Sequence, residues 1–393
     1  MNMKTDKMPS ILYITVPSFF DLEISLLREL AKIVDLTVLM LVIPESRQSS
    51  ALDISSISLE TGVYEACKLE EMDKYRHLLP LEVLKMAFLS KNSFSEMKRL
   101  RPEITDVVSS RKYDLIHATS LSKFAIWLYP TFSGIKKRLL TLHDPIPHDK
   151  LPFLKRLMHE ITIRRFKNVL LLNKNQTYAF MQRRHLTVPK IFYSRLGAYD
   201  FLNSFGNCKT PVKEGKKYIL FFGRIEPYKG VDNMIRAFKK SDSLKKGYSL
   251  VIAGKGKINE PHSESDGIIC LNNYIPNEML SSLIKGASFT IATYLSATQS
   301  GVIMSSYACG TPVLVTPVGN LPDATLSTDG SSLGHVCAGT DMKSVLEGIE
   351  FMTNHESEID GYRKNIKKAF APEGEMGWHR IALELKDIYS QII

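Results

Sequence analysis

Cysteine is scarce in this sequence and forms no recognisable motif. The chain has 393 residues and five cysteines, an odd number, widely scattered and without a CxxC pair. This pattern disfavours a disulfide framework or a zinc knuckle and is typical of a reducing compartment. We therefore expect a cytoplasmic protein.

Long apolar runs and several familiar catalytic motifs are also missing. The first apolar run contains Pro17 and leads into Asp21 and Glu23, unlike a signal peptide, and no other run approaches the length that spans a bilayer. There is no GxSxG, Walker loop or GxGxxG. The absence of an Asp-x-Asp pair counts against a divalent-metal site for a diphosphate.

Basic residues are concentrated in the first half of the chain, without a matching number of acidic ones. Residues 1–200 carry 30 basic against 21 acidic residues, whereas the remainder has 21 against 20. Residues 136–195 alone hold 14 basic and three acidic residues. Such a stretch could meet an anionic membrane, phosphorylated ligands or nucleic acid. Because no nucleic-acid-binding motif accompanies it, we expect no nucleic-acid partner and favour an anionic membrane surface.

The periodicity predicts strands that alternate with helices. Apolar runs at 11–16 and 36–43 flank a helical pattern, and further short apolar runs follow at 115–118, 138–142 and 168–172. A second alternation runs from Tyr218 to Val315, after a segment rich in turn residues. The predicted fold class is α/β, with two tandem Rossmann-like, doubly wound domains that face a cleft. We expect domains at 1–205 and 206–375.

The loop after the first strand of the second domain has the parts of a phosphate site. It reads FFGRIEPYKG and places Gly223, Arg224 and Lys229 at a strand end, just before a helix whose N-terminal amides also favour an anion. The alternative interpretation is a solvated turn with two surface cations.

A second loop, at 296–301, opens another helix of the same domain. Backbone amides, the hydroxyls of Thr298 and Ser300, and Gly301 could cradle an anion there. Taken alone, the loop could equally be an ordinary Ser/Thr-capped helix start. Two such loops at neighbouring strand ends favour the anion site.

The first domain contributes a loop with two histidines. The strand at 138–142 runs into HDPIPH, in which His143 and His148 flank Asp144. The prolines stiffen the loop, so His143 is expected at a strand end. A metal site is a minor alternative, because no further ligand cluster is evident. The segment 151–169 has helical spacing, either as a basic amphipathic helix or as a helix packed on its own sheet.

The residues from Tyr218 to Asp323 resemble the family 4 retaining glycosyltransferases of the GT-B fold. The matching pieces are FFGRIEPYKGVDNMIRAF, LVIAGKG, NNYIPNEMLSSLIKGASFTI and YACGTPVLVTPVGNLPD, in the family's order. Weaker likeness extends through YDLIHATS, LTLHDPIPH and APEGEMGWHRIA.

The resemblance implies an enzyme that binds a nucleotide-activated sugar in its second domain and an acceptor in its first. It assigns Arg224 and Lys229 to the donor diphosphate and His143 to the transferred sugar. The last helix, at 376–393, would cross back to the first domain. The other expected donor-binding residues are Gly223, Gly254, Lys255, Ile275, Thr298, Gln299, Ser300, Gly301, Val302 and Ser305. On the acceptor side we expect Phe20, Asp21, Asp144 and His148.

The implied mechanism needs neither a metal nor a protein nucleophile. Negative charge grows on the leaving diphosphate, where Arg224, Lys229 and the amides after Gln299 would stabilise it. In such retaining enzymes the acceptor attacks on the leaving group's own face, and the diphosphate takes the proton. We therefore expect no cofactor and no metal.

One feature departs from the family pattern. The family commonly carries two glutamates eight positions apart, for the sugar hydroxyls and the ribose, and this sequence has Ala297 and Ser305 there. The leading hypothesis is a glycosyltransferase of cell-surface polysaccharide or lipopolysaccharide assembly, peripheral on the inner face of the cell membrane, with a glycan or lipid-linked acceptor. The alternatives are a degenerate GT-B protein that serves as a non-catalytic partner subunit and, ranking lower, a sugar-nucleotide epimerase.

Overall fold

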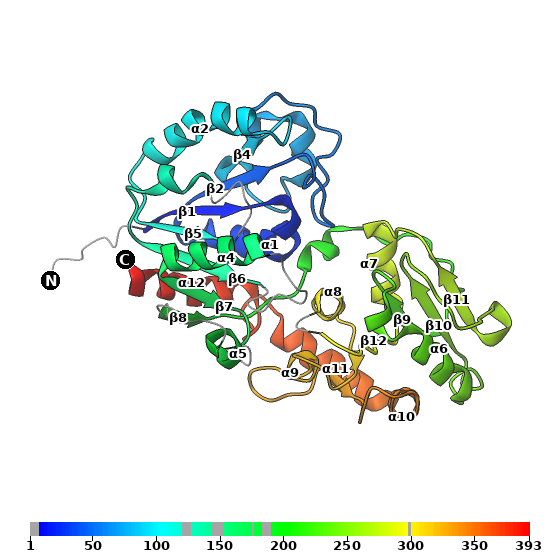
Figure 1. Ribbon diagram of the computed structural model, residues 1–393. Helices are drawn as coiled ribbons and strands as arrows, with labels where there is room; N and C mark the ends of the chain where they lie inside the picture. Colours follow the sequence, from blue (N-terminus) through cyan, green and yellow to red (C-terminus); the bar gives the residue numbers. More distant parts are fainter. Residues whose placement is uncertain (1–7, 120–126, 144–152, 175–176, 183–189, 298–299) are drawn as a thin grey trace. The chain divides into compact units, whose positions relative to one another are not determined.

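The computed structural model describes residues 8–119, 127–143, 153–174, 177–182, 190–297 and 300–393. The chain divides into two compact units (Figure 1). The N-terminal unit comprises Met1–Leu196 with Ile381–Ile393, and the C-terminal unit comprises Gly197–Arg380.

The N-terminal unit is built on an eight-stranded sheet. Its strands are β1 (Ser10–Thr15), β2 (Asp35–Val42), β3 (Gly62–Glu65), β4 (Leu84–Phe88), β5 (Leu115–Ala118), β6 (Arg138–Leu142), β7 (Asn168–Leu171) and β8 (Lys190–Tyr193). They are ordered β3-β4-β2-β1-β5-β6-β7-β8, and every pair is parallel except β3 with β4. The described helices are α1 (Phe20–Leu30), α2 (Phe94–Ser109), α4 (Phe153–Phe166), α5 (Thr177–Gln182) and α12 (Trp378–Ile392).

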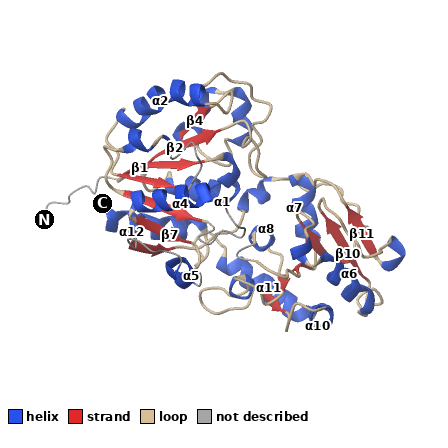
Figure 2. Ribbon diagram, in the orientation of Figure 1, coloured by secondary structure: helices blue, strands red, loops and turns tan. Residues whose placement is uncertain are grey.

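The C-terminal unit has a six-stranded parallel sheet of order β11-β10-β9-β12-β13-β14. Its strands are β9 (Lys217–Phe222), β10 (Tyr248–Ala253), β11 (Ile268–Leu271), β12 (Phe289–Ala292), β13 (Val313–Val315) and β14 (Gly334–Val336). Its helices are α6 (Val231–Lys240), α7 (Asn277–Gly286), α8 (Gly301–Ala308), α9 (Leu321–Ala324), α10 (Met342–Asn354) and α11 (Glu356–Ala369). Figure 2 shows how helices and strands alternate in both units.

The central strands of both sheets form the cores. Every residue of β1 is buried, and β9 is buried from Tyr218 to Phe222, because helices and further strands cover parallel strands on all sides. Helix α1 packs its apolar side inward, with Leu27 and Leu30 fully buried. The predicted fold class, two tandem doubly wound α/β units, is confirmed.

The division between the units differs in detail from the predicted boundaries. We expected the first domain to end at residue 205, but residues from Gly197 onward group with the C-terminal unit. The reason is a set of hydrogen bonds: Tyr199 donates its backbone N–H to Met304, and Ser281 of α7 donates its hydroxyl to the carbonyl of Leu202. The turn residues after position 203 thus lie inside the C-terminal unit.

The last helix changes unit along its length. Its first residue, Trp378, donates its indole N–H to the carbonyl of Ala198 at 2.7 Å within the C-terminal unit. From Ile381 onward it packs with the N-terminal unit, where Tyr389 is fully buried. The passage to the N-terminal unit therefore begins five residues later than the predicted boundary at 376.

Candidate functional site

The loop from β9 to α6 positions a lysine beside a glycine at the strand's carboxyl end. A Cβ placed on Gly223 would lie 3.1 Å from Nζ of Lys229, so the lysine side chain folds back toward the strand. Gly230, directly after it, has φ of +67° and caps α6. A Cβ on Gly230 would lie 2.2 Å from the carbonyl oxygen of Thr293, so only glycine allows this close approach of the loop to the end of β12.

Lys229 is a nearly buried cation with aromatic neighbours. Its residue is 7% exposed, and Nζ lies 5.4 Å from the ring centroid of Tyr294 and 5.9 Å from that of Phe221. Burial, helped by the positive charge of Arg224 and opposed by Glu226, lowers the pKa of Lys229 to about 8. Among the described residues no carboxylate lies within ion-pair distance of its ammonium. A desolvated cation in this state is stabilised by any anion that reaches it.

Arg224 has the opposite environment. Its side chain is exposed, and it makes no ion pair within the described part of the chain. It lies close enough to Lys229 to contribute to the lowered pKa of that lysine. The loop thus presents one buried and one solvent-exposed positive charge, both of them free to meet an anion.

The loop before α8 approaches the same strand end. Val302 Cγ2 lies 3.7 Å from the position that a Cβ on Gly223 would take. The hydroxyl of Ser300 meets the hydroxyl of Tyr294 at 3.3 Å and does not cap its own helix. The structure therefore brings the two predicted anion loops together around Gly223 and Lys229. Thr298 and Gln299 lie outside the described residues.

Two further residues of the predicted donor site lie on α8 and are partly or fully buried. A Cβ on Gly301 would lie 3.1 Å from the ring of Tyr199, and Ser305 is 7% exposed. Ser305 is one of the two positions at which the resemblance leads one to expect a carboxylate. The other, Ala297, is half-buried at the start of the loop.

The segment after β10 runs alongside the loop after β9. A Cβ on Gly254 would lie 2.0 Å from the carbonyl oxygen of Gly223, so a residue with a side chain would not fit at this position. Ile225 donates its backbone N–H to the carbonyl of Lys255 at 2.9 Å. Asn272 holds the segment in place through both backbone groups of Gly256, at 3.0 and 2.9 Å. Sequence reasoning missed Asn272, although its place directly after β11 is a usual position for functional polar residues.

Ile275 is 9% exposed, and Lys255 is exposed. No hydrogen bond or ring contact joins either side chain to Lys229 among the described residues. The assignment of these two residues to the donor site therefore remains a prediction.

In the N-terminal unit, His143 lies at the carboxyl end of β6 as predicted from the sequence. Its Nε2 atom is 3.4 Å from Oε1 of Glu23, and its ring stacks on Phe19 at a centroid distance of 4.7 Å. Glu23 is 2% exposed and was missed by the sequence analysis. A signal was present, because an acidic residue shares the apolar helix face of Leu27 and Leu30 at spacings of four and seven.

The predicted acceptor-side residues of α1 have structural roles. Phe20 is 1% exposed and belongs to the core, so no substrate reaches it. Asp21 accepts backbone N–H groups of Ser50 and Ala51 at 2.9 and 2.6 Å and so fixes the loop after β2. The placement of these two residues does not support acceptor contacts. Asp144 and His148 lie outside the described residues.

The basic stretch at 136–195 separates into distinct groups. Arg138 donates to the carbonyls of Ile135 and Phe132, and Arg195 pairs with Glu384, so both serve the fold. Seven other cations are exposed: Lys136, Lys137, Arg164, Arg165, Lys167, Lys174 and Lys190. The side chains of Lys150, Lys155, Arg156, Arg183 and Arg184 lie outside the described residues.

Four of the exposed cations gather at one edge of the sheet. Lys136 and Lys137 precede β6, Lys167 precedes β7, and Lys190 begins β8, so all four lie at the amino ends of adjacent parallel strands. His143 lies at the opposite, carboxyl end of β6. A strand of five residues separates the two edges by about 17 Å.

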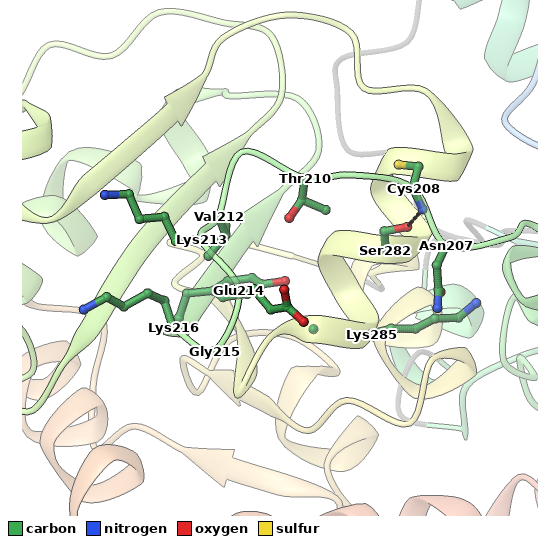
Figure 3. Close-up of a pocket in the computed structure, with 12 residues that line it drawn as sticks. Asn207, Cys208, Thr210, Val212, Lys213, Glu214, Gly215, Lys216, Ser282 and Lys285 are labelled. Carbon is green, nitrogen blue, oxygen red and sulfur yellow. Dashed lines mark hydrogen bonds between the residues drawn. The ribbon is translucent and has the colours of Figure 1, made fainter.

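A pocket of about 390 Å³ lies elsewhere in the C-terminal unit (Figure 3). It is bounded by the segment 207–216 and by α7, where Ser282 accepts the backbone N–H of Cys208 at 2.9 Å. This places the pocket at the amino end of β9, away from the carboxyl end that carries Gly223. It is therefore separate from the predicted donor site.

Among the described residues, no group of three or more His, Cys, Asp or Glu side chains could hold a metal ion. None of the described helices is long and apolar enough to cross a lipid bilayer.

Comparison with known proteins identifies the C-terminal unit. Residues 208–369 match the family model described as glycosyl transferases group 1. These residues belong to that family. The predicted resemblance is confirmed, and the group 1 module covers the loops around Gly223, Lys229 and α8.

A curated relative supports the same family. The chain is 29% identical over 199 residues to a D-inositol 3-phosphate glycosyltransferase of Nocardiopsis dassonvillei, over 46% of this chain and 44% of the relative. The matched region spans less than half the length of the curated relatives.

Solved structures extend the likeness beyond the group 1 module to nearly the whole chain. HepE of Anabaena, solved in complex with UDP, is 14% identical with a TM-score of 0.63, over 97% of this chain and all of that one. A UDP-N-acetylglucosamine 2-epimerase is also 14% identical, with a TM-score of 0.58 over 98% and 97% of the two chains. At such identities the likeness establishes the GT-B fold. Since an epimerase shares this fold, the fold by itself does not distinguish sugar transfer from other chemistry.

Proposed function

We propose that the chain is a retaining glycosyltransferase that takes its sugar from a nucleoside-diphosphate donor. The observation that carries the proposal is Lys229, a buried cation without a carboxylate partner among the described residues, next to Gly223 and to the start of α8. Arg224 adds a second positive charge. The family match supports a glycosyltransferase, and the UDP bound to the related HepE structure supports a nucleoside diphosphate as ligand.

The two cations would act on the leaving group. As the bond between sugar and diphosphate breaks, negative charge increases on the diphosphate oxygens, and preorganised cations in a partly desolvated site stabilise that charge. The backbone N–H groups at the start of α8 would also stabilise this negative charge. In this proposal the cations supply the charge that a divalent metal supplies elsewhere, so turnover should persist in a chelator.

Calorimetry with UDP and with a panel of nucleotide sugars tests the donor site. We expect binding by the wild type in the presence of EDTA, and a loss of at least tenfold in affinity for Lys229→Met. Lys240→Met, at the exposed end of α6, is the matched control and should bind as the wild type does. Equal affinity in all three proteins would refute the assignment. The anomeric configuration of the product, read by NMR, tests the retaining mechanism.

The acceptor that we propose is a glycan or a lipid-linked saccharide of cell-surface polysaccharide or lipopolysaccharide assembly. The resemblance of the residues from Tyr218 to Asp323 to the family 4 glycosyltransferases motivates it. A screen of such acceptors, in which the release of nucleoside diphosphate is measured, tests the proposal. Donor hydrolysis without any transfer of the sugar would count against it.

A non-catalytic nucleotide-binding subunit is the second candidate. The alanine at 297 and the buried serine at 305 favour it, because neither supplies the carboxylate that the resemblance leads one to expect. Tight binding of a nucleotide sugar, with no turnover on any acceptor and no hydrolysis, would support this candidate over the transferase.

We further propose that the exposed lysines at the amino ends of β6, β7 and β8 hold the protein at an anionic inner leaflet. Each lysine that reaches such a surface contributes about 1 kcal/mol. Flotation with anionic and with neutral liposomes tests this, with the quadruple change of Lys136, Lys137, Lys167 and Lys190 to Gln as the variant. Binding that is equal on both kinds of liposome would contradict the proposal.

A further inference from the structure

A carboxylate lies buried at the start of the first helix, among hydrogen-bond donors. Glu23 is 2% exposed, and its Oε2 atom accepts the hydroxyl of Thr15. The phenol of Tyr13, 1% exposed, also hydrogen-bonds to it. Glu23 is in the first turn of α1, where the amide end of the helix favours negative charge. The buried carboxylate is thus compensated on several sides.

His143, directly after β6, is a further partner of the Glu23 carboxylate. Its side chain is 10% exposed, with Nε2 at 3.4 Å from Oε1 of Glu23. The ring of Phe19 stacks on the imidazole with an interplanar angle of 15°. The stacking fixes the plane of the imidazole, and the carboxylate fixes which ring edge points into the protein.

The donor and acceptor types determine the tautomer of His143. An ionised carboxylate only accepts hydrogen bonds, so the contact with Glu23 is favourable when Nε2 carries the proton. In the neutral ring the other nitrogen, Nδ1, then holds a lone pair. Among the described residues nothing hydrogen-bonds to Nδ1.

We propose that Glu23 is a positioning residue for His143: it accepts Nε2–H and leaves Nδ1 available to accept a hydrogen bond from a hydroxyl of the sugar substrate. The inference rests on the proposed function, in which His143 contacts that sugar. Glu23 itself does not touch the substrate. Its effect on turnover passes through His143, and this distinguishes it from a residue that merely stabilises the fold.

The tautomer is measurable without any turnover. In protein labelled with ¹⁵N-histidine and studied at alkaline pH, the ring resonances of His143 are assigned by their loss in His143→Gln. We expect the Nε2–H form in the wild type and the appearance of the Nδ1–H form in Glu23→Met. A wild-type ring in the Nδ1–H form, or spectra that are the same in both proteins, would overturn the proposal. Because no sugar is present, this result is independent of whether the proposed activity exists.

Kinetics then test the route through His143. Glu23→Met, which removes the acceptor at similar side-chain length, should lower kcat/KM at least tenfold, whereas Glu23→Gln keeps an acceptor oxygen and should stay within about threefold of the wild type. The double variant Glu23→Met/His143→Gln should be no slower than His143→Gln alone. If Glu23→Met slows the enzyme by the same factor in both backgrounds, the role is structural and the proposal fails.

Two controls separate positioning from the loss of a buried polar group. Glu29 is another buried glutamate of α1, 8% exposed and paired with Lys32 at 2.7 Å, and Glu29→Met should leave kcat/KM unchanged. Thr15→Val removes a different hydrogen bond of Glu23 and should leave the tautomer of His143 unchanged. A tenfold loss of kcat/KM in Glu29→Met, or the Nδ1–H form in Thr15→Val, would contradict the proposal.

Discussion

The ammonium of Lys229 lies 5.4 Å from the ring centroid of Tyr294, in a part of the C-terminal unit where both side chains are almost completely buried. An aromatic ring offers a cation some electrostatic stabilisation, but less than water or a carboxylate does. The same burial therefore acts on both groups: it lowers the pKa of Lys229 to about 8 and raises the pKa of Tyr294 to about 12.

This pair leads to a prediction about pH. An anion binds the protonated form of Lys229 more tightly, so affinity for UDP should be constant below about pH 8 and fall as the pH rises above it, by up to tenfold per unit. Tyr294 stays neutral over this range, because its pKa is raised to about 12. Calorimetry at pH 7 and pH 9.5 measures the effect. In Lys229→Met the affinity should be lower and nearly independent of pH; an unchanged pH dependence would show that another group titrates.

A second prediction concerns turnover. If Arg224 and Lys229 stabilise the leaving diphosphate, replacing either one by alanine removes about 2–4 kcal/mol of transition-state stabilisation, which lowers kcat by about 30-fold to 10³-fold. The steady-state release of nucleoside diphosphate measures this loss. Lys240→Ala is the control on an exposed lysine of α6 and should behave as the wild type does. Full turnover in both loop variants would exclude the loop from catalysis.

The sequence predicts the central elements of both sheets well. The bounds of β5 and β6 agree with the predicted ranges, because each is a short apolar run that follows turn residues. The edge strand β3 and its neighbour β4 were missed. They pair with each other across the segment 66–83, whose 3-10 turns give no periodic signal, and this antiparallel pair is set by tertiary contacts.

The candidate site shows the same division. Gly223 and Lys229 could be predicted because the carboxyl ends of parallel strands meet at one edge of the sheet. Outside the site, helix α11 was not predicted from the sequence. Its many charged residues obscured the pattern, although its four buried residues recur at helical spacing. The contact of Glu23 with His143 joins residues 120 positions apart, and no local pattern encodes it. The acidic residue on an apolar helix face was the available signal, but it does not indicate its partner.

A third prediction concerns the close approach at Gly230. An alanine there would both require φ of +67° and place Cβ 2.2 Å from a backbone oxygen of Thr293. Gly247 has a similar φ of +82° with nothing within 4 Å of its Cβ, so Gly247→Ala measures the cost of the conformation alone, about 1–2 kcal/mol.

Chemical denaturation should therefore show a larger loss for Gly230→Ala than for Gly247→Ala, by about 1–3 kcal/mol for the overpacking. Because the loop must shift to relieve the clash, Gly230→Ala should also weaken UDP binding, which Gly247→Ala should not. Equal losses of stability in the two variants would mean that the loop moves freely away from β12.

The last prediction concerns His117, a fully buried histidine of β5. Its Nδ1 and Nε2 atoms lie 2.7 Å from the hydroxyls of Tyr389 and Thr141, and burial, with a further effect of His143, lowers its pKa to about 3. In the unfolded chain a histidine titrates near 6.5. Between these values the unfolded state binds more protons, so the stability of the folded protein falls as the pH falls below about 6.5.

The stability advantage of the wild type over His117→Gln should therefore be about 2 kcal/mol smaller at pH 5 than at pH 8. Urea unfolding of the full chain at both pH values measures it. Tyr389→Phe, which keeps the histidine, should retain the wild-type pH dependence; an advantage that is the same at both pH values would mean that His117 takes up a proton in the folded protein as readily as in the unfolded chain.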